Sequence, residues 1–567
     1  MSEVNIKDSL KITLAQLNPA VGDVDGNLSI VRNAREIAKK NNSDLVVFPE
    51  LFLSGYPPED LVLKPAFIKK IDSALKALVK ETNDMGPAIL LGLPTQGKHK
   101  PFNSIALIDC GKIVAIQHKV HLPNYGVFDE KRVFEKGSMP GPVNFRGVRI
   151  GFAICEDIWF DDVTECLAET GSEIIIVPNG SPYNKAKNHV RLNHVMARVV
   201  ETGQPLVYLN QVGGQDELVF DGASFVVNSD YSIPVQLPSF SEMIIHTNWF
   251  KKENKWVCND DIITAEEDNL TLMYQASVLG LKDYVLKNGF KDVLIGLSGG
   301  IDSALVAAIA VDALGNENVR CIMLPSKYTS DESREDAIEC GGKLKIKLDE
   351  VGISEITSKF ESSLETLFLG QKKDITEENI QSRSRGVILM AISNKFNSLL
   401  ITTGNKSEMA VGYATLYGDM SGAFNPLKDI YKTEVYSLAV MRNKKVPNNC
   451  LGSSGVIIPE RIISKAPTAE LRENQSDQDS LPPYDILDRL LIGLIEDDLS
   501  VEELVKGGFE YDLVCRIQNL LYISEYKRRQ APPGVKISLK NFGRDRRYPI
   551  TNNYRDTLEA GGIENEK

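Results

Sequence analysis

The sequence has no apolar run of about 18 or more residues, the length that a helix needs to cross a membrane, so no transmembrane helix is expected. The first residues, MSEVNIKDSLK, have neither the basic segment nor the apolar stretch of a signal peptide. The eight cysteines form no CxxC pair, so neither a zinc cluster nor a disulfide framework is indicated. These absences predict a protein of the reducing cytoplasm with no membrane partner.

Positive charge is also in short supply. The chain has 77 Asp and Glu against 64 Lys and Arg, which gives a formal net charge of −13 and a pI near 5.2. A nucleic-acid partner is not expected, because contacts to phosphates require clustered Lys and Arg. Two basic clusters lie late in the chain, at residues 527–529 and 544–547. They are too short for a polyanion groove but suit one or two small phosphates.

The first half of the chain alternates short apolar segments with amphipathic ones, and 567 residues are too many for one hydrophobic core. Residues 27–40 and 64–80 have the periodicity of amphipathic helices. The number of strands in about 220 residues is high for one doubly wound sheet, so we expect an αββα sandwich of two sheets with helices outside. The predicted strands are 11–17, 44–48, 88–93, 104–108, 113–117, 148–154, 174–177, 206–209 and 224–227.

The second half has a different pattern. A predicted helix at 270–286 precedes a strand at 293–297, a Gly-rich turn and an Ala-rich helix at 303–314. Further strands at 319–324 and 399–402, separated by helices, predict βαβ units around a doubly wound, mainly parallel sheet. Residues 465–483 are polar and contain proline, and are expected to form a mobile loop. The expected domains are 10–250 and 269–550, with a polar linker at 251–268 and a tail at 551–567.

Three strand ends in the first half carry residues that can do chemistry. DLVVFPE ends at Glu50, IVAIQHK ends at Lys119, and RIGFAICED contains Cys155. A thiol with a pKa near ~8.5 is little ionised at neutral pH and needs a base or a cation nearby. A carboxylate can take its proton, and an ammonium can stabilise the thiolate and a later oxyanion. Taken singly, the cysteine could equally be a small core residue, and the other two could be surface charges.

The segments around these residues resemble the nitrilase superfamily, whose members hydrolyse or transfer C–N bonds with a Glu-Lys-Cys triad. The resemblance rests on FPELFLSGYPPEDL, HKVHLPNYGVFDEKRVF and GFAICEDIWF, and covers roughly residues 12–230. It implies that Glu50 is the general base, Lys119 the cation that stabilises the oxyanion, and Cys155 the nucleophile. Glu130 matches a second glutamate that positions the substrate or the lysine, although it could also be a surface carboxylate beside Lys131 and Arg132.

The same resemblance implies a pocket for glutamine. Tyr125, Glu130, Ser181 and Lys187 would line it around the α-amino and α-carboxylate groups of the substrate. Lys187 stands where an arginine is common in the family. An ammonium keeps the charge but loses the two-pronged hydrogen bonding of a guanidinium, so this contact is weaker.

A Gly-rich loop, GLSGGIDS at residues 296–303, lies between a predicted strand and the Ala-rich helix. Glycines allow the backbone to approach an anion, and the loop amides and helix N-terminus supply positive potential. No lysine follows the glycines, so the loop is not GxxxxGK[ST], and it is not GxGxxG either. A simple strand-to-helix turn, with Asp302 or Ser303 capping the helix, is the alternative.

SGGxDS resembles the signature of the N-type ATP pyrophosphatases, which adenylate a carbonyl oxygen and release pyrophosphate. The resemblance implies that ATP is a co-substrate, held by the loop and by Thr403 farther along. Asp302 would bind Mg²⁺, a hard cation that prefers carboxylate and phosphate oxygens. The implied ATP-binding residues are Gly296, Leu297, Ser298, Gly299, Gly300, Ile301, Asp302, Ser303 and Thr403.

Segments farther along resemble the NAD synthetase family within that group. They include LPSKYTS, ENIQSRSRG, TTGNKSEMAVGYATLYGDMSGAFNPLKDIYKTEV, KAPTAELRENQSDQDSLPPYDILD and GRDRRYPI, and cover nearly all of residues 292–550. The resemblance implies that Glu408 joins Asp302 at the metal or contacts the dinucleotide, and that Asn379, Arg383 and Lys527 face deamido-NAD. The 465–483 loop would then close over the site and exclude water.

Together the two halves resemble the glutamine-dependent NAD synthetases. The expected reaction, the last step of NAD biosynthesis, releases ammonia from glutamine and uses it to amidate ATP-activated deamido-NAD. A homo-oligomer is also implied, either a dimer of synthetase domains or a larger assembly such as an octamer. Three alternatives remain: another nucleotide acceptor, an N-terminal half that is only a scaffold, and a Rossmann oxidoreductase. The complete triad disfavours the second, and the lack of GxGxxG disfavours the third.

Overall fold

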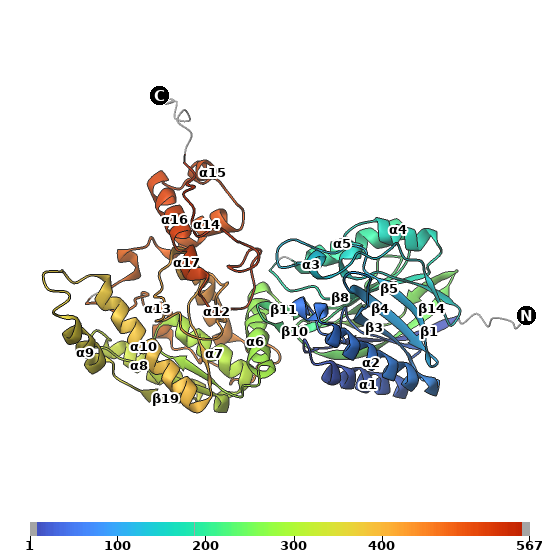
Figure 1. Cartoon of the computed structure of the whole chain (residues 1–567), viewed down its shortest axis with the longest axis horizontal. Coiled ribbons are helices and arrows are strands. Elements are labelled where there is room, and N and C mark those ends of the chain that lie inside the picture. The colour runs from blue at the N-terminus through green and yellow to red at the C-terminus, as the bar shows by residue number, and fades with distance from the viewer. Residues whose placement is uncertain (1–7, 186, 474, 558–567) are drawn as a thin grey trace, which may run out of the picture. The chain divides into compact units, whose positions relative to one another are not determined.

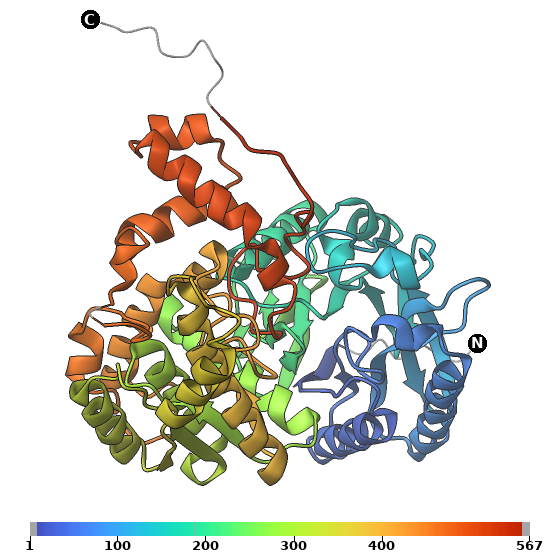
Figure 2. The same cartoon turned by 60° about the vertical axis from the view of Figure 1, so that its left-hand side comes forward.

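The computed structural model describes residues 8–185, 187–473 and 475–557, with the backbone alone at Asn188. The chain divides between Glu267 and Asp268 into two compact units, called unit 1 and unit 2 (Figures 1 and 2). In the described part of the chain, no helix is both long enough and apolar enough to cross a membrane.

Unit 1 contains two seven-stranded sheets. In order across the first sheet lie β15 (Lys255–Cys258), β14 (Met243–Lys252), β1 (Ser9–Gln16), β2 (Leu45–Val47), β3 (Ala88–Thr95), β4 (Phe102–Asp109) and β5 (Lys112–His118). In order across the second lie β16 (Ile262–Ile263), β13 (Val235–Gln236), β12 (Phe225–Val227), β9 (Leu206–Asn210), β8 (Ile174–Asn179), β7 (Val148–Phe152) and β6 (Val143–Phe145). A separate hairpin joins β10 (Val212–Gln215) to β11 (Leu218–Asp221).

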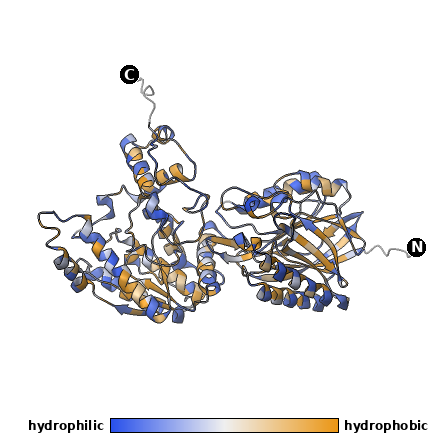
Figure 3. Cartoon of the chain, viewed as in Figure 1, coloured by the Kyte–Doolittle hydropathy of each residue, from blue (hydrophilic) through white to orange (hydrophobic). Residues whose placement is uncertain are grey.

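The period of two along each strand determines which side chains meet between the sheets. In β1, Ile12 and Leu14 join a core shared with Ile150 of β7 and Ile176 of β8. The strands are accordingly mainly hydrophobic in Figure 3. Ala15 of β1 instead belongs to a second core on the opposite face of its sheet. The inner faces of the two sheets therefore pack on each other.

Helices cover the outer faces. On the first sheet lie α1 (Val24–Lys40) and α2 (Pro65–Glu81), which bury Val31 and Leu78. On the second lie α4 (Asp162–Glu169) and α5 (Lys187–Thr202). This is the αββα sandwich that the sequence predicted. The remaining short elements are α3 (Glu130–Val133), η1 (Glu59–Leu63), η2 (Thr82–Asp84) and η3 (Cys155–Ile158).

The segment predicted as a linker, 251–268, is built differently. Its first part completes the β14–β15 hairpin, in which Lys252 pairs with Lys255, and β16 then pairs with β13 of the other sheet. Trp256 and Cys258 point into the core, while Lys255 is exposed and Val257 is half-buried. An edge strand buries only alternate side chains, so its polar composition resembled that of a linker.

Unit 2 is built on a four-stranded parallel sheet in the order β19 (Lys347–Glu350), β18 (Val319–Met323), β17 (Val293–Gly296) and β20 (Leu399–Ile401). On one face, Leu389 of α10 (Ile375–Phe396) packs against Leu294 and Leu400. All residues of α7 (Ile301–Leu314) except Asp302 are buried, and the helix contacts β17, β18, α6 (Asn269–Lys287) and α12 (Lys432–Lys444). The predicted doubly wound parallel sheet is confirmed, and its winding reverses between β17 and β20. Ligands bind at such reversals, beyond the carboxyl ends of the strands.

A second apolar core in unit 2 is helical. It joins Met409 of α11 (Lys406–Val411) to α14 (Tyr484–Ile495), α15 (Val501–Lys506) and α16 (Tyr511–Ile523). The remaining elements are α8 (Asp331–Leu344), α9 (Ser354–Leu364), α13 (Glu460–Ser464), α17 (Glu525–Arg528), η4 (Asn316–Asn318) and η5 (Asp477–Asp479). Of the predicted tail, residues 558–567 lie outside the described residues, whereas Asp556 accepts a hydrogen bond from the Val501 amide at 2.7 Å.

Candidate active sites

The three predicted catalytic residues of unit 1 each follow a strand. Glu50 lies three residues after β2, Lys119 directly after β5, and Cys155 at the start of η3, three residues after β7. The backbone of Cys155 has a φ of 46°, in the left-handed region that non-glycine residues rarely occupy. Such strain is held only where the surroundings dictate it, and is common at functional sites.

Glu50 is fully buried and is held by hydrogen bonds from several directions. Its Oε1 accepts from Lys119 Nζ at 2.6 Å and from Asn103 Nδ2 at 2.7 Å. Its Oε2 accepts from the Gly180 backbone amide at 2.9 Å. The position of this carboxylate is therefore fixed before any substrate arrives.

Lys119 lies between two glutamates. Its Nζ is also 2.9 Å from Glu130 Oε1, which accepts a further hydrogen bond from the Tyr56 hydroxyl at 2.8 Å. Burial lowers the pKa of Lys119, but the charges of Glu130 and Glu50 outweigh burial, and the net pKa is well above its ordinary value. Burial raises the pKa of Glu130 to about 7, against the opposing charge of Lys119. Lys119 is therefore a permanently charged ammonium at this position.

Cys155 is 4 % exposed. Burial, followed by the negative charge of Glu50, raises the pKa of its thiol well above the ordinary value, although Lys119 acts in the opposite direction. The thiol therefore carries its proton at neutral pH. A base must remove that proton for the sulfur to react, and Glu50 is a base whose position is already fixed.

Two of the predicted glutamine-binding residues surround a carboxylate that the sequence analysis missed. The Tyr125 hydroxyl donates to Glu156 Oε1 at 2.9 Å. Burial raises the pKa of Glu156, although the charge of Lys119 and, more weakly, that of Lys187 oppose it. The Lys187 ammonium also lies 5.3 Å from the ring centroid of Phe128. The Lys187 ammonium thus acts on the Glu156 carboxylate, and Glu156 follows directly after Cys155 in the chain.

Ser181 lies in a different set of contacts. Its backbone amide donates to Asn210 Oδ1 at 2.9 Å, and its hydroxyl accepts from Arg191 Nε at 3.1 Å. Arg191 is in turn paired with Asp221 at 2.7 Å, and both side chains are buried. The structure therefore gives the Ser181 hydroxyl a partner inside the protein, and Ser181 follows directly after Gly180, which binds Glu50.

The second site is a cavity of about 650 Å³ in unit 2. Its wall includes the whole 296–303 loop and the residues that follow β20. Every residue predicted to bind ATP, deamido-NAD or metal lies on it. They are Gly296, Leu297, Ser298, Gly299, Gly300, Ile301, Asp302, Ser303, Asn379, Arg383, Thr403, Glu408 and Lys527.

The 296–303 loop has the backbone that an anion-binding turn requires. Gly299 has a φ of +84°, and a Cβ there would lie 2.2 Å from the Ser333 carbonyl oxygen, so only glycine fits. The Ser303 hydroxyl accepts from the Ser298 amide at 3.2 Å, and the Ser298 hydroxyl accepts from the Gly300 amide at 3.2 Å. The loop leads directly into α7, whose N-terminus supplies positive potential.

Asp302 and Glu408 come together on one ammonium. Lys432 Nζ lies 2.5 Å from Asp302 Oδ2 and 3.0 Å from Glu408 Oε1. Asn405 Nδ2 donates to the other oxygen of Asp302 at 2.9 Å. Burial raises the pKa of Glu408 to about 7, while Lys432 opposes it. Within the described ranges, no group of three or more His, Cys, Asp or Glu side chains is arranged to hold a metal ion, so the protein offers two carboxylates here.

The three residues predicted to face the dinucleotide all contact one segment, 412–416. Asn379 accepts from the Thr415 hydroxyl at 3.0 Å, and Arg383 Nε donates to the Leu416 carbonyl at 3.2 Å. Lys527 Nζ donates to the carbonyls of Gly412 and Ala414, both at 2.7 Å. This segment is therefore the shared wall of that end of the cavity.

The loop predicted to cover the site borders the cavity with residues 465–471, Gln475 and Asp477. Glu470 accepts hydrogen bonds from the hydroxyls of Ser330 and Ser333 at 2.8 and 2.7 Å, at the start of α8. Gln381 of α10 donates to the Leu471 carbonyl at 2.8 Å. The loop is thus tied to both sides of the cavity.

The late basic clusters differ from expectation. Arg528 is 4 % exposed and donates to the Ala410 carbonyl at 2.6 Å, and both Arg528 and Arg546 bind the buried Glu525. These two guanidiniums therefore stabilise the interior of unit 2, because each forms a charge-assisted hydrogen bond with the buried carboxylate of Glu525. The sequence alone did not indicate this pairing. Of the two clusters, Lys527 is the member that lines the cavity.

Several residues of the two sites were not predicted from the sequence: Tyr56, Asn103, Glu156, Arg191 and Lys432. Glu156 is adjacent to the predicted nucleophile, and Lys432 lies in the quoted segment KDIYKTEV. These positions therefore carried a local signal. Asn103 and Arg191 carried none, since they reach Glu50 and Ser181 only through the fold.

Comparison with known proteins agrees with this geometry. The family model for carbon-nitrogen hydrolase matches residues 11–248, and that for NAD synthase matches residues 273–531. The glutamine-dependent NAD(+) synthetase of Rhodobacter capsulatus is 49 % identical over 97 % of this chain and 99 % of its own length. That of Xanthomonas campestris pv. campestris is 44 % identical over 96 % of this chain and 98 % of its own.

A solved structure is similar over the same extent. It is the glutamine-dependent NAD+ synthetase of Acinetobacter baumannii in complex with ADP, 39 % identical, with a TM-score of 0.76. The alignment covers 97 % of this chain and all of that one. Both units, with the residues of both sites, lie inside these matches. The chain therefore belongs to the family of glutamine-dependent NAD(+) synthetases.

Proposed function

We propose that unit 1 hydrolyses the side-chain amide of glutamine with Glu50, Lys119 and Cys155. Glu50 takes the thiol proton, and the Cys155 sulfur then forms a bond to the amide carbon. Lys119 faces the oxygen that becomes negative in this step. The proton returns from Glu50 to the departing nitrogen, which leaves as ammonia, and water then cleaves the glutamyl thioester to glutamate.

The contacts of Glu130 support this assignment. Glu130 and Glu50 together neutralise the buried ammonium of Lys119 and fix its direction. Tyr125 and Glu156, with Lys187, would bind the charged groups of glutamine, and Ser181, held by the buried Arg191, would line the same pocket. Because a free thiol is required, we place the reaction in the cytoplasm. All eight cysteines lie in the described part of the chain, and none forms a disulfide.

We propose that unit 2 binds ATP on the 296–303 loop and Thr403, and deamido-NAD against Asn379, Arg383 and Lys527. The nicotinate carboxylate attacks the α-phosphorus of ATP and pyrophosphate leaves. Ammonia then adds to the activated carbonyl and AMP leaves, which gives the carboxamide of NAD. The loop amides and the N-terminus of α7 would hold the departing pyrophosphate.

Asp302 and Glu408 would hold Mg²⁺. They are two carboxylates that reach the same cation position, each with 18 % of the side chain exposed, on the wall beside the phosphate loop. Mg²⁺ commonly takes one or two carboxylates and completes its shell with phosphate oxygens and water, so the residues fit the metal. When bound, it would neutralise charge on the leaving pyrophosphate. Lys432 now occupies the space between the carboxylates, and its ammonium would face the phosphates.

One observation carries the assignment of unit 2. All the residues expected to bind ATP and the dinucleotide, although 231 positions separate Gly296 from Lys527 in the sequence, line one cavity at the switch point of a parallel sheet. The test supplies deamido-NAD, Mg-ATP and glutamine labelled with ¹⁵N at the side-chain amide. We expect the label in the carboxamide of NAD. If another nucleotide acid were amidated faster than deamido-NAD, the alternative acceptor would replace this one.

We further propose that the protein is a homo-oligomer in which synthetase units pair through α10 and the loop that precedes it. One side of α10 lines the cavity with Asn379 and Arg383, while Val387 and Phe396 of the same helix are 68 % and 57 % exposed. Leu367 and Leu369, in the preceding loop, are 76 % and 83 % exposed. An apolar surface of this kind, continuous with a ligand site, is typical of a protein interface.

Light scattering tests the assembly. Wild-type protein should exceed the 62.8 kDa of one chain. Val387→Glu should shift it toward the monomer, whereas Val200→Glu, at an exposed valine of α5 in unit 1, should not. A fully active monomer would contradict the proposal.

A further inference from the structure

Four consecutive residues around the start of α11 point in two directions. Glu408 lines the cavity and binds Lys432, and the buried Asn405 donates to Asp302 on the cavity wall. Lys406 and Ser407, which lie between them, are 0 % exposed and do not line the cavity. Neither of these two residues takes part in the proposed reaction. A buried lysine side chain beside an active-site residue therefore has no role yet.

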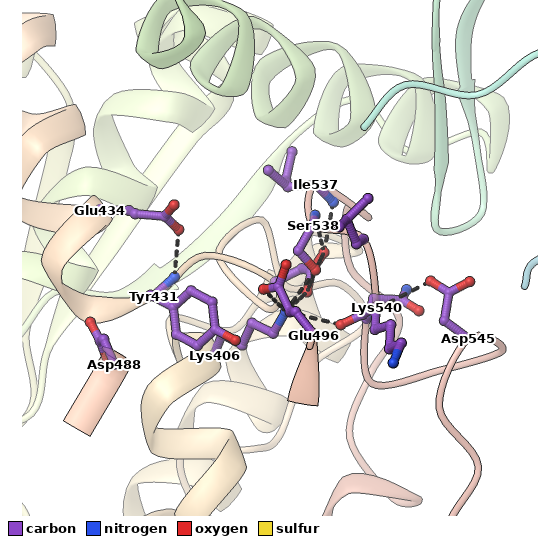
Figure 4. A network of polar contacts seen from close by, with 12 residues as sticks. Lys406, Tyr431, Glu434, Asp488, Glu496, Ile537, Ser538, Lys540 and Asp545 are labelled. Atoms are coloured by element: carbon purple, nitrogen blue, oxygen red, sulfur yellow. Dashed lines mark hydrogen bonds and ion pairs between the residues drawn. The ribbon is translucent and has the colours of Figure 1, made fainter. Parts of the chain in front are cut away.

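The Lys406 ammonium is surrounded by oxygen atoms (Figure 4). Its Nζ lies 2.6 Å from the Ser538 hydroxyl, 2.9 Å from Asp429 Oδ1 and 3.1 Å from Glu496 Oε1. The Lys540 carbonyl accepts from it at 2.9 Å. The ring centroid of Tyr431 lies 4.7 Å away. All of these groups come from the loop before α12, from the end of α14 and from residues 536–540, called the C-terminal segment.

Asp429 binds both Lys406 and the C-terminal segment. Its Oδ2 accepts from the backbone amides of Ile537 and Ser538, both at 2.7 Å, and the Ser538 hydroxyl lies 2.8 Å from Oδ1. Burial raises the pKa of Asp429, but the charges of Lys406 and Lys536 outweigh it and the net pKa is lowered. Asp429 is therefore a carboxylate whose partners are all supplied by Lys406 and the C-terminal segment.

Ser407, next to Lys406 in the chain, contacts the backbone of Lys432, the other residue of the synthetase site. Its hydroxyl accepts from the Lys432 backbone amide at 2.9 Å and donates to Asp488 Oδ1 at 2.5 Å. Asp488 Oδ2 also accepts from the Thr433 amide at 2.9 Å. The backbone that carries Lys432 is thus attached to the turn that carries Glu408, on the side away from the cavity.

Stability alone does not account for this arrangement. Burying a lysine and carboxylates removes their hydration, and an apolar replacement of similar volume is often as stable. What a charged network adds is a fixed backbone geometry, because its hydrogen bonds form only when the segments that carry the partners are correctly placed. α11 has only six residues and could not hold Asn405 and Glu408 in place by its own hydrogen bonds.

We propose that Lys406, bound to Asp429 and Ser538, is a positioning residue that fixes Asn405 and Glu408 at the synthetase site through the C-terminal segment. The inference rests on the proposed role of Asp302 and Glu408 at that site. Partners of this outer kind typically change metal affinity by about 10–100-fold when they are removed. The effect reaches the site through the backbone of residues 405–408.

The test compares Lys406→Met with Arg442→Met in the full-length protein. Arg442 is a matched control, since it too is a buried cation paired with a buried carboxylate, Asp312, at 2.5 Å, and it lies away from the 405–408 turn. The first measurement is hydrogen exchange of the residue 405–411 amides without ligands. We expect Lys406→Met to speed that exchange by about tenfold or more, and Arg442→Met to leave it unchanged.

The second measurement is Mn²⁺ binding, with Mn²⁺ alone and then with ATP, followed by electron paramagnetic resonance. Lys406→Met should weaken it by about tenfold, Ser538→Ala by a smaller factor in the same direction, and Lys406→Arg less than Lys406→Met. Equal affinity in wild type and Lys406→Met, or an equal loss in Arg442→Met, overturns the proposal. A wild-type protein that binds no Mn²⁺ would instead overturn the metal assignment of Asp302 and Glu408, and the exchange measurement would still decide the role of Lys406.

Discussion

Each unit contains a buried lysine between two carboxylates, but the two sites differ in access to water. Lys119 binds Glu50 and Glu130, and all three side chains are between 0 % and 6 % exposed. Lys432 binds Asp302 and Glu408, whose side chains are each 18 % exposed on a cavity of about 650 Å³. In both cases the carboxylates raise the lysine pKa against the effect of burial.

This difference in access to water means that Lys119 is a permanent partner of its two carboxylates, whereas Lys432 can be exchanged for another cation. Removing the charge of Lys119 would leave two carboxylates unpaired in the interior, so this cluster is assembled before any substrate binds, as the covalent chemistry proposed for it requires. The carboxylates beside Lys432 face a space large enough for phosphates and a metal ion, so their partner can change during a turnover. Four sets of variants test this contrast, from the largest expected effect to the smallest.

Cys155→Ala should abolish glutamine-supported NAD synthesis, by at least about 10⁴-fold, because no other group supplies the nucleophile. Ammonium-supported synthesis should persist, since the ATP site belongs to the other unit. Assays of NAD formation with each nitrogen source measure both activities. Cys110→Ala, at an exposed cysteine of the same unit, is the control and should keep both. Equal loss with both nitrogen sources in a folded Cys155→Ala protein would show that the two sites are not separate.

Lys119→Met should destabilise unit 1 by about 3–5 kcal/mol, because it leaves Glu50 and Glu130 buried without a counter-charge. Lys432→Met should cost unit 2 about 1 kcal/mol or less, because water reaches Asp302 and Glu408. The three tryptophans, Trp159, Trp249 and Trp256, all lie in unit 1, so their fluorescence during urea unfolding reports that unit.

Far-ultraviolet circular dichroism in the same titration reports both units, so a transition that the tryptophan fluorescence does not show belongs to unit 2. If Lys119→Met and Lys432→Met lost similar amounts of stability, the proposed difference between the enclosed Lys119 and the solvent-accessible site of Lys432 would be wrong.

Asp302→Asn should lower synthesis with either nitrogen source by about 10²-fold, which is the usual scale for losing one electrostatic stabiliser. Pyrophosphate release from Mg-ATP is the direct measurement. Asp283→Asn, at a buried carboxylate of α6 that does not line the cavity, provides the comparison and should remain active. Near-normal turnover of Mg-ATP by Asp302→Asn would take this residue out of the metal site.

Glu130→Gln should change the pH profile of glutamine hydrolysis more than its maximum. Burial raises the pKa of Glu130 to about 7, so the carboxylate is ionised above that pH and protonated below it. Only the ionised form gives Lys119 its second carboxylate, so wild-type activity should rise by a few-fold as pH increases through 7. The variant should lack this rise. If Glu130→Gln kept the rise in activity through pH 7, that rise would belong to another titrating group.

The candidate reactive residues were easier to predict from the sequence than the residues that hold them in place. Glu50, Lys119 and Cys155 were recognisable because each follows an apolar strand in a segment that resembles the nitrilase superfamily, and Gly299 because it lies in the motif SGGIDS. The structure adds the reason for that glycine, since its φ is +84° and a Cβ there would lie 2.2 Å from the Ser333 carbonyl oxygen. The sandwich and the parallel sheet followed from the spacing of apolar segments. Periodicity carries this information because burial of one face is a local property.

Residues that act through distant contacts were not predictable. Asn103 binds Glu50 from another strand, and Arg191 reaches Ser181 from α5. The strands β15 and β16 were missed because an edge strand with one exposed face has the composition of a polar linker. Arg528 and Arg546 carried the charge expected of phosphate ligands, but a single buried Glu525 directs both inward.

The position of Ser538 in the chain also bears on how the protein is made. Asp429 and Lys406 obtain their partners from residues 536–540, close to the C-terminus, whereas unit 1 ends at Glu267. Translation proceeds at about 5–20 residues per second, so unit 1 can fold some tens of seconds before the last contacts in unit 2 exist. A ribosome-bound chain would therefore already hold a folded glutaminase while its ATP site was still incomplete. During that interval any ammonia released would have no activated acceptor on the same chain.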